Sequence, residues 1–285
     1  MTIDAPHHAA PSGEPAAPAG MIVPLGITLA IQILATMAAL TVPVLAPEAA
    51  RTTGLPAALV GGIHAVVCVG AMQYAQEGGN LGGRYGAIRV SQACLLLSGV
   101  GLAFAALGTA WSLALSALLI GCGYGPITPS SSHILARSTP AHRMGFLFSV
   151  KQTGVPLGGA LAGLAVPPLV LLWGWQGAAL AVGAACAVMA LIAQGVRADF
   201  DADRDPRRKV SLGGVLRPLA EVFAHRDIRD LAFCTFFLSA MQLCLTTYLV
   251  TYLTAEYGAS LVTAGFVLSL SQFAGAGGRL LWGYA

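Results

Sequence analysis

The chain has 285 residues, of which 56% are hydrophobic and 9% are charged, and its mean hydropathy is +0.74. Soluble domains carry about 25% charged residues, so a chain with so little charge cannot cover a globular surface and most of its outside must face lipid. The net charge of +3 is small, and no basic patch interleaved with aromatic residues suggests a nucleic-acid partner. The composition excludes an ordinary soluble domain and predicts a membrane protein.

The chain opens with a polar tail and continues with eight apolar stretches. Residues 1–20 are rich in Ala, Pro and His, which predicts a disordered tail that cannot bury a core. Each apolar stretch meets or approaches the 20 residues or so that a helix needs to cross a hydrocarbon core of about 30 Å. The predicted spans are 21–46, 55–76, 90–109, 112–135, 146–173, 175–194, 231–253 and 261–283. We therefore expect an all-α membrane protein.

The longest polar stretch, 195–230, separates six predicted helices in 21–194 from two in 231–285. It holds 15 of the 27 charged residues and is predicted to be a solvated cytoplasmic linker. Its segment "DFDADRD" superficially resembles a calcium loop, but Arg204 stands where such a loop needs Gly and Val210 where it needs Glu. The six cysteines all lie in apolar runs without metal-ligand spacing, so no metal site is expected.

The basic residues predict the orientation. If the N-terminus lies in the cytoplasm, 13 of the 15 Lys and Arg residues fall on the cytoplasmic side, with Arg51 outside and Lys151 within a span. This is a strong positive-inside bias. We expect a multi-pass protein of a bacterial inner (plasma) membrane with a cytoplasmic N-terminus.

The link between the second and third spans, "GNLGGRYGAIR" (residues 79–89), carries two arginines and four glycines. It resembles the loop between helices 2 and 3 of transporters of the major facilitator superfamily, whose pattern is roughly G-x-L-a-D-R-x-G-R-R. The resemblance implies a tight, positively anchored gating loop. Its expected gating residues are Gly79, Gly83, Arg84, Gly86 and Arg89. The carboxylate of the family pattern, which helps to hold the two halves shut, is replaced by Gly83, and Glu77 is a candidate substitute.

Two further segments resemble the same family. "GAGGRLLWGYA" (residues 275–285) ends the eighth span as a second copy of that loop would begin, and residues 137–164 resemble the fourth loop and fifth helix. A complete member has twelve helices in two halves. The resemblance therefore implies a bundle of this type with a complete N-terminal six-helix half and the first two helices of the C-terminal half, apparently truncated after the eighth helix.

Candidate solute-binding residues are the polar side chains inside the spans. Lys151 is the only basic one, and a Lys at a helix centre costs about 2.5–3.5 kcal/mol; it either snorkels to the inner headgroups or faces the cavity and attracts an anion. The other candidates lie on helices that line the cavity in the family, several of them four residues apart and thus on one helix face. The predicted substrate-binding set is Lys151, Gln152, Gln32, Thr36, Tyr124, Thr128, Gln242, Thr246 and Tyr248, with His64 and Gln272 as weaker candidates.

Small residues predict close helix packing. Gly154, Gly158 and Ala162 form a stripe on the fifth span, and we expect it to meet the Gly-rich face of the eighth span around Gly275.

No HExxH, GxSxG or P-loop motif is present, so we expect neither an enzyme nor a cofactor. The predicted function is secondary active transport of a small solute by alternating access across the lipid bilayer, and Lys151 favours an organic anion as that solute. The coupling ion, a proton or sodium, is not assigned, because no Asp or Glu lies well inside a span. The alternative is a membrane receptor or interaction protein that retains the fold without transporting.

Overall fold

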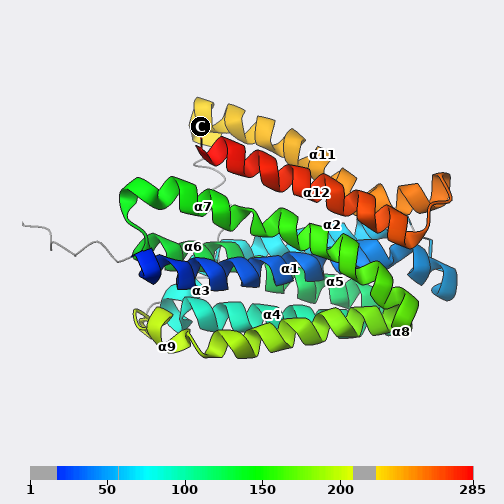
Figure 1. Ribbon diagram of the computed structural model, residues 1–285, viewed down its shortest axis with the longest axis horizontal. Coiled ribbons are helices and arrows are strands. Elements are labelled where there is room, and N and C mark those ends of the chain that lie inside the picture. Colours follow the sequence, from blue (N-terminus) through cyan, green and yellow to red (C-terminus); the bar gives the residue numbers. More distant parts are fainter. Residues whose placement is uncertain (1–17, 57, 208–222, 285) are drawn as a thin grey trace, which may run out of the picture.

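The computed structural model describes residues 18–56, 58–207 and 223–284, and every regular element in these ranges is helical (Figure 1). The helices are α1 (Pro18–Thr53), α2 (Leu59–Ala75), α3 (Gly78–Tyr85), α4 (Ala87–Ala105), α5 (Ala110–Tyr124), α6 (Ile127–Ser138), the short 3-10 helix η1 (Ala141–Arg143), α7 (Met144–Gln152), α8 (Gly154–Gln194), α9 (Arg197–Phe200), α11 (Arg226–Glu256) and α12 (Leu261–Tyr284). The predicted all-α fold is confirmed.

The described residues contain six helices long and apolar enough to cross a membrane, or seven if the bent pair α2–α3 is one span. One of them, Met144–Gln194, has 51 residues, about twice what one crossing needs. It turns back on itself at Gly174, where φ is 70° (Figure 1). Counted as two crossings, this segment brings the total to the eight that the sequence predicts.

Several predicted boundaries shift. α1 runs from Pro18 to Thr53, beyond both ends of the predicted span 21–46. The predicted disordered tail otherwise falls on residues 1–17, which lie outside the described residues. The fourth span is broken into α5 and α6 around Pro126, whose ring nitrogen has no N–H to continue the helical hydrogen bonds.

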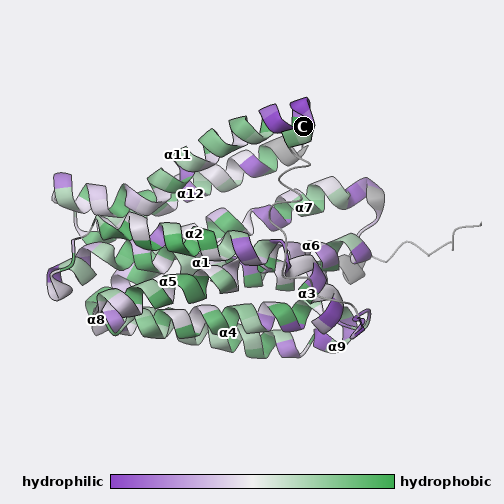
Figure 2. Ribbon diagram, turned by 180° about the vertical axis from the view of Figure 1, so that it is seen from behind, coloured by the Kyte–Doolittle hydropathy of each residue, from purple (hydrophilic) through white to green (hydrophobic). Residues whose placement is uncertain are grey.

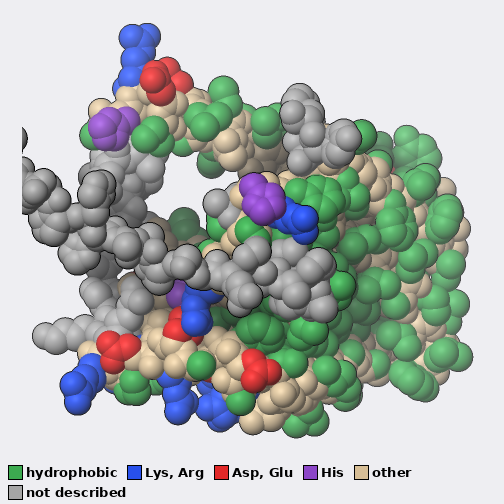
Figure 3. All heavy atoms as spheres, turned by 60° about the vertical axis from the view of Figure 1, so that its left-hand side comes forward, with side chains coloured by type: hydrophobic (Ala, Val, Ile, Leu, Met, Phe, Trp, Pro, Cys, Tyr) green, Lys and Arg blue, Asp and Glu red, His purple; other side chains and the backbone are tan. Residues whose placement is uncertain are grey.

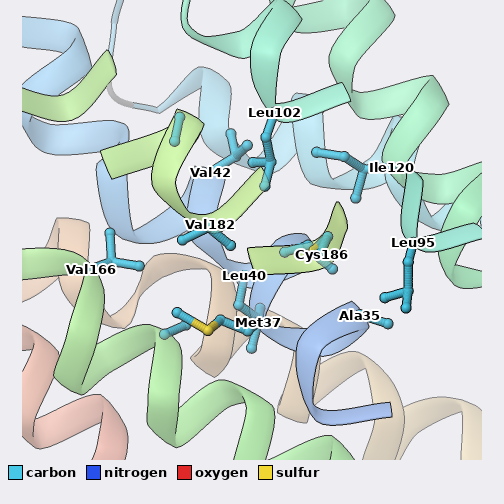
Figure 4. Packing of buried hydrophobic residues seen from close by; sticks show 14 of the residues in the cluster. Ala35, Met37, Leu40, Val42, Leu95, Leu102, Ile120, Val166, Val182 and Cys186 are labelled. Atoms are coloured by element: carbon cyan, nitrogen blue, oxygen red, sulfur yellow. The ribbon is translucent and has the colours of Figure 1, made fainter. Parts of the chain in front are cut away.

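The hydrophobic side chains lie both inside the bundle and on its flank. Ala35 of α1, Leu95 of α4, Ile120 of α5 and Cys186 of α8 are fully buried in one cluster (Figure 4). Hydrophilic residues gather at the end that carries α9, which we call the polar end (Figure 2), and the flank of the bundle is covered by apolar side chains (Figure 3). Leu171, Leu191 and Met241 are more than 70% exposed. Such a surface suits hydrocarbon rather than water.

Small residues let the helices approach closely, although one predicted contact is wrong. A Cβ atom at Gly158 would collide with the carbonyl oxygen of Ile33, and one at Gly154 would lie 3.0 Å from the side chain of Gln32, so this stripe faces α1 rather than α12. The contact with α12 is made by Gly159 and Gly163, each one residue further on. One residue is about 100° around a helix, which is enough to exchange one partner for another.

The predicted gating loop is also different from expectation. Gly79, Gly83 and Arg84 lie inside the helix α3, and the chain turns only at Gly86, where φ is 98°. Such a φ is open to Gly at little cost and strained for other residues. The link is therefore a short helix followed by a one-residue turn into α4.

Asp201, which follows α9, holds this turn. Its Oδ1 accepts the backbone N–H of Ile88 at 2.8 Å and its Oδ2 that of Arg89 at 3.1 Å, so it caps the N-terminus of α4 from more than 100 residues away. The carboxylate is buried, and the Nε of Arg197 lies 3.6 Å from Oδ2. A Cβ at Gly86 would collide with it. Asp201 thus brings a carboxylate to the loop whose family pattern has one, at a place the sequence does not predict.

The residues after Asp201 make further contacts at this turn, and we call residues 201–205 the clasp. Asp203 contacts Nε2 of His133 at 2.7 Å and Nη1 of Arg137 at 2.6 Å, and the N–H of Asp205 donates to the carbonyl of Gly83 at 2.8 Å. Burial opposes ionisation of Asp203, but the hydrogen bond from His133 and the charge of Arg137 outweigh it and lower the pKa of this carboxyl. Residues 202–205 are exposed, as the predicted solvated linker would be, whereas Asp201 is buried and departs from that prediction. Residues 208–222 of the predicted linker lie outside the described residues.

Replacing Asp201 by Asn tests this clasp. The amide keeps the size of the side chain but loses the charge and places an NH2 group against backbone donors, so we expect a loss of about 1–2 kcal/mol, the usual worth of an N-cap. Thermal unfolding in detergent should show a lower midpoint. The matched control is Asp199→Asn, because Asp199 is exposed two residues earlier; equal midpoints for both variants would contradict the capping role.

Candidate functional site

A polar cavity of about 590 Å³ lies between the first spans and the α11–α12 pair. It is lined by Thr36, Ala39 and Leu40 of α1, His64, Val67, Cys68 and Ala71 of α2, Tyr124 of α5, Val155 of α8, Gln242, Leu243 and Thr246 of α11, and Gln272 of α12. Apolar walls with a few convergent amide, hydroxyl and imidazole groups are typical of a binding site for a small organic molecule.

A second cavity, of about 480 Å³, lies away from the polar end and is lined by apolar residues, with Trp175 and Thr53 at its edge. It offers almost no group that could orient a polar solute. The polar cavity is therefore the candidate functional site.

The structure brings four of the predicted binding residues to the wall of this cavity: Thr36, Tyr124, Gln242 and Thr246. His64 and Gln272, the weaker candidates, lie there too. Tyr248 does not. Its hydroxyl occupies the notch above Gly61 of α2, because two residues after Thr246 is about 200° around the helix.

A chain of polar groups leads from the cavity toward α6. The Nε2 of Gln32 donates to Thr36 Oγ1 at 3.4 Å, and the hydroxyl of Thr128 donates to Gln32 Oε1 at 3.1 Å. Gln32 is fully buried. The sequence selects these residues as separate pairs on two helices. In the structure, Gln32 hydrogen-bonds both Thr36 of the cavity wall and Thr128, so the three residues form one connected network.

Lys151 of α7 lies at the end of this network. Its Nζ donates to the backbone carbonyl of Thr128 at 3.2 Å and approaches Ser132 Oγ at 3.5 Å. Only 1% of the residue is exposed, which contradicts the snorkelling alternative. Among the described residues no carboxylate forms an ion pair with it, so this cation is neutralised only by dipoles, a costly state in a protein interior.

A second cation lies beside this region. α7 ends at Gln152, and Pro156, four residues on, has no N–H to donate to the carbonyl of Gln152. The Nη1 of Arg279 from α12 donates to that carbonyl at 3.1 Å, while the side-chain Oε1 of Gln152 is buried without a partner in the described part of the chain. Arg279 is one of the basic residues that predict the orientation, but it is not among the predicted binding residues. Pro156 is the sequence signal that could have indicated this contact, because it leaves the carbonyl of Gln152 without its helical N–H donor.

These features define a class of protein: a multi-pass α-helical membrane protein with a polar cavity at the junction of its helices and a buried cation that polar residues connect to the cavity wall. The chain belongs to the Major Facilitator Superfamily, whose family model matches residues 27–285. This confirms the resemblance drawn from the loop motifs, and the superfamily is one of membrane transporters rather than enzymes.

Solved structures agree with the fold. The chain is 21% identical, with a TM-score of 0.67, to a bacterial homolog of the human lysosomal transporter Spinster in an inward-facing and occupied conformation, covering 88% of this chain and 58% of that one. It is 19% identical, with a TM-score of 0.55, to the peptide transporter POT in complex with sulfate, covering 82% and 47%. The chain thus spans less than two thirds of these neighbours. A search of curated proteins finds no match.

Lys151→Met separates structure from function at this site. Methionine has a similar length without charge, and replacing a buried ion by an apolar residue is often neutral or stabilising, by about 1–4 kcal/mol. We expect the thermal unfolding midpoint of Lys151→Met in detergent to equal or exceed that of the original protein. Ser132→Ala, which removes only one neighbour of Nζ, serves as the control. A midpoint lowered as far as in Asp201→Asn would show that Lys151 is a structural residue.

Proposed function

We propose that the protein is a secondary active transporter that moves a small organic anion across the membrane by alternating access. One observation carries the choice of an anion: Lys151 is buried, has no carboxylate partner among the described residues, and is joined to the cavity through Thr128, Gln32 and Thr36. An intramembrane cation is expensive, and such residues usually serve a substrate or ion pathway.

The rest of the cavity suits the remainder of such a solute. Amide and hydroxyl groups from Gln242, Gln272 and Thr246 can hydrogen-bond a polar substituent, while Leu40 and Val67 present apolar surface. We propose that the predicted set of binding residues, apart from Tyr248, acts in this way, with Arg279 added near the anionic end. The membrane orientation follows the basic residues: the polar end and the N-terminus face the cytoplasm, in a bacterial inner membrane.

The alternative, a receptor that retains the fold, rests mainly on the missing carboxylate at Gly83. Asp201 weakens that ground, since its carboxylate sits on the same loop and joins it to the end of α9. We therefore favour transport.

A panel of small mono- and dicarboxylates, with their uncharged amides, tests the proposal. Binding is measured as a rise in the thermal unfolding midpoint in detergent, and flux as uptake of the labelled binder into liposomes that contain the protein. A charge-assisted hydrogen bond is worth about 1.5–3 kcal/mol, so Lys151→Met should weaken binding about 10- to 100-fold, with Lys151→Arg retaining part of it.

Ser149→Ala is the matched control, because Ser149 lies on α7 and hydrogen-bonds only its own helix, at Gly145. Equal binding of acids and amides, or full uptake by Lys151→Met, would refute the role of Lys151. Binding without uptake of any acid would favour the receptor.

A further inference from the structure

One titratable side chain in the cavity is unused by the site as described. His64 lies on the face of α2 that lines the cavity, together with Val67, Cys68 and Ala71 at helical spacing. The residue is only 9% exposed, and its Nδ1 is buried without a hydrogen-bond partner in the described part of the chain. A buried polar nitrogen without a partner costs about 1–3 kcal/mol, so an unpaired imidazole here calls for a reason.

Among the described residues, the side chains around His64 include no other group that ordinarily changes charge near neutral pH. Cys68 lies on the same face of α2, and Cys122 and Tyr124 come from α5. Tyr248 of α11 packs against Gly61, which is about one helical turn before His64. Thiols and phenols ordinarily lose their protons only above about pH 8 and 10.

The remaining helices around the cavity add no acid. α1 presents Thr36 and α12 presents Gln272, and no carboxylate lines the cavity within the described residues. Glu77, beyond the end of α2, lies thirteen residues after His64, about 20 Å along the chain direction at 1.5 Å per residue. Histidine is the side chain that ordinarily titrates between about pH 5 and 8.

We infer that His64 is the proton-binding residue that couples proton movement to the solute, so that the transporter carries a proton together with an organic anion. The inference rests on the function proposed above and names its coupling ion. The step is simple: a proton passes from cavity water to the free imidazole nitrogen, forming one N–H bond, and returns to water on the other side of the membrane. No other bond forms or breaks.

The anion provides the coupling. An imidazolium in the apolar cavity would be costly alone, but a carboxylate in the same cavity attracts it strongly, because the local dielectric constant is low. Each ligand therefore strengthens the binding of the other by the same factor.

The position of His64 also fits such a role. Gln242, Leu243 and Thr246 of α11 line the same cavity, so a charge on His64 forms where the first six spans meet the α11–α12 pair.

The first measurement concerns the proton alone. The imidazole signals of isotope-labelled histidine are followed by NMR in detergent between about pH 5 and 8. His64→Gln identifies the His64 signal and keeps hydrogen-bonding groups without a site for the proton, and His142→Gln, which removes an exposed imidazole, is the matched control. We expect the assigned signal to titrate in this range in the presence of acetate as the anionic probe. A signal unchanged throughout, with or without acetate, would overturn the inference.

The second measurement concerns coupling. For an acid found in the panel above, the original protein and His142→Gln should bind it about tenfold more tightly at about pH 5.5 than at pH 7.5, and a pH gradient should drive its accumulation in liposomes. His64→Gln should bind it with the same affinity at both pH values and only equilibrate it. Its unfolding midpoint, and that of His64→Asn as a second variant, confirms that both proteins fold. Accumulation of the acid by His64→Gln would overturn the inference and leave the proposal of transport intact. If the original protein shows no flux, the proposed function fails. In that case the NMR titration still decides whether His64 binds a proton.

Discussion

The first backbone N–H groups of α4 need an acceptor, and the way in which the chain supplies one organises the polar end. An N-cap usually comes from the residue next to the helix, but here that residue is Gly86, which has no side chain, and the acceptor is Asp201 from beyond α8. The capping bond therefore also closes the six-span half: it ties the last described turn of that half, α9, to the junction of its second and third spans. Asp203 and Asp205 add contacts to α6 and α3, so four elements share one short acidic segment.

Charged residues are scarce in this chain, and the carboxylates of the clasp differ from the buried Lys151 in the partners that they find. At the polar end each carboxylate of the clasp meets a cation or a backbone donor among the described residues, and for the buried Asp201 these contacts offset the cost of desolvation. Lys151 has backbone and hydroxyl oxygens but no counter-charge among the described residues. A protein under selection for stability alone would replace such a cation, since apolar residues of the same volume do as well or better. Its presence at the end of a polar network that starts in the cavity wall is the physical argument for a ligand that brings the missing charge. Binding sites commonly keep residues that cost stability because function needs them.

The sequence predicts the features that depend on local pattern. Eight apolar stretches gave the crossings, and residues four apart gave the polar faces, so Thr36, Tyr124, Gln242 and Thr246 all reach one cavity. What it could not predict depends on distance along the chain or on rotation about a helix axis. Asp201 caps α4 by accepting from the backbone N–H of Arg89, which lies 112 residues earlier in the chain. The composition of the acidic stretch around Asp201 predicts only a solvated linker. Gly159 rather than Gly158 faces α12, because one residue changes the direction by about 100°.

The contacts between α12 and the earlier spans are made largely through backbone groups and small residues. Ser269 donates to the carbonyl of Ala160 at 2.8 Å, Arg279 donates to that of Gln152, and Gly163 meets Gly265 backbone to backbone. Glycines leave no side chain between two backbones, so these contacts bring the helices close together. The same device recurs within the first six spans, where Gly99 of α4 and Gly183 of α8 meet backbone to backbone. Ala264 and Leu268 of α12 also belong to the buried cluster that contains Ala35, Leu95 and Cys186. The close approach of small residues and the continuous core that hold the first six spans together therefore extend to α12.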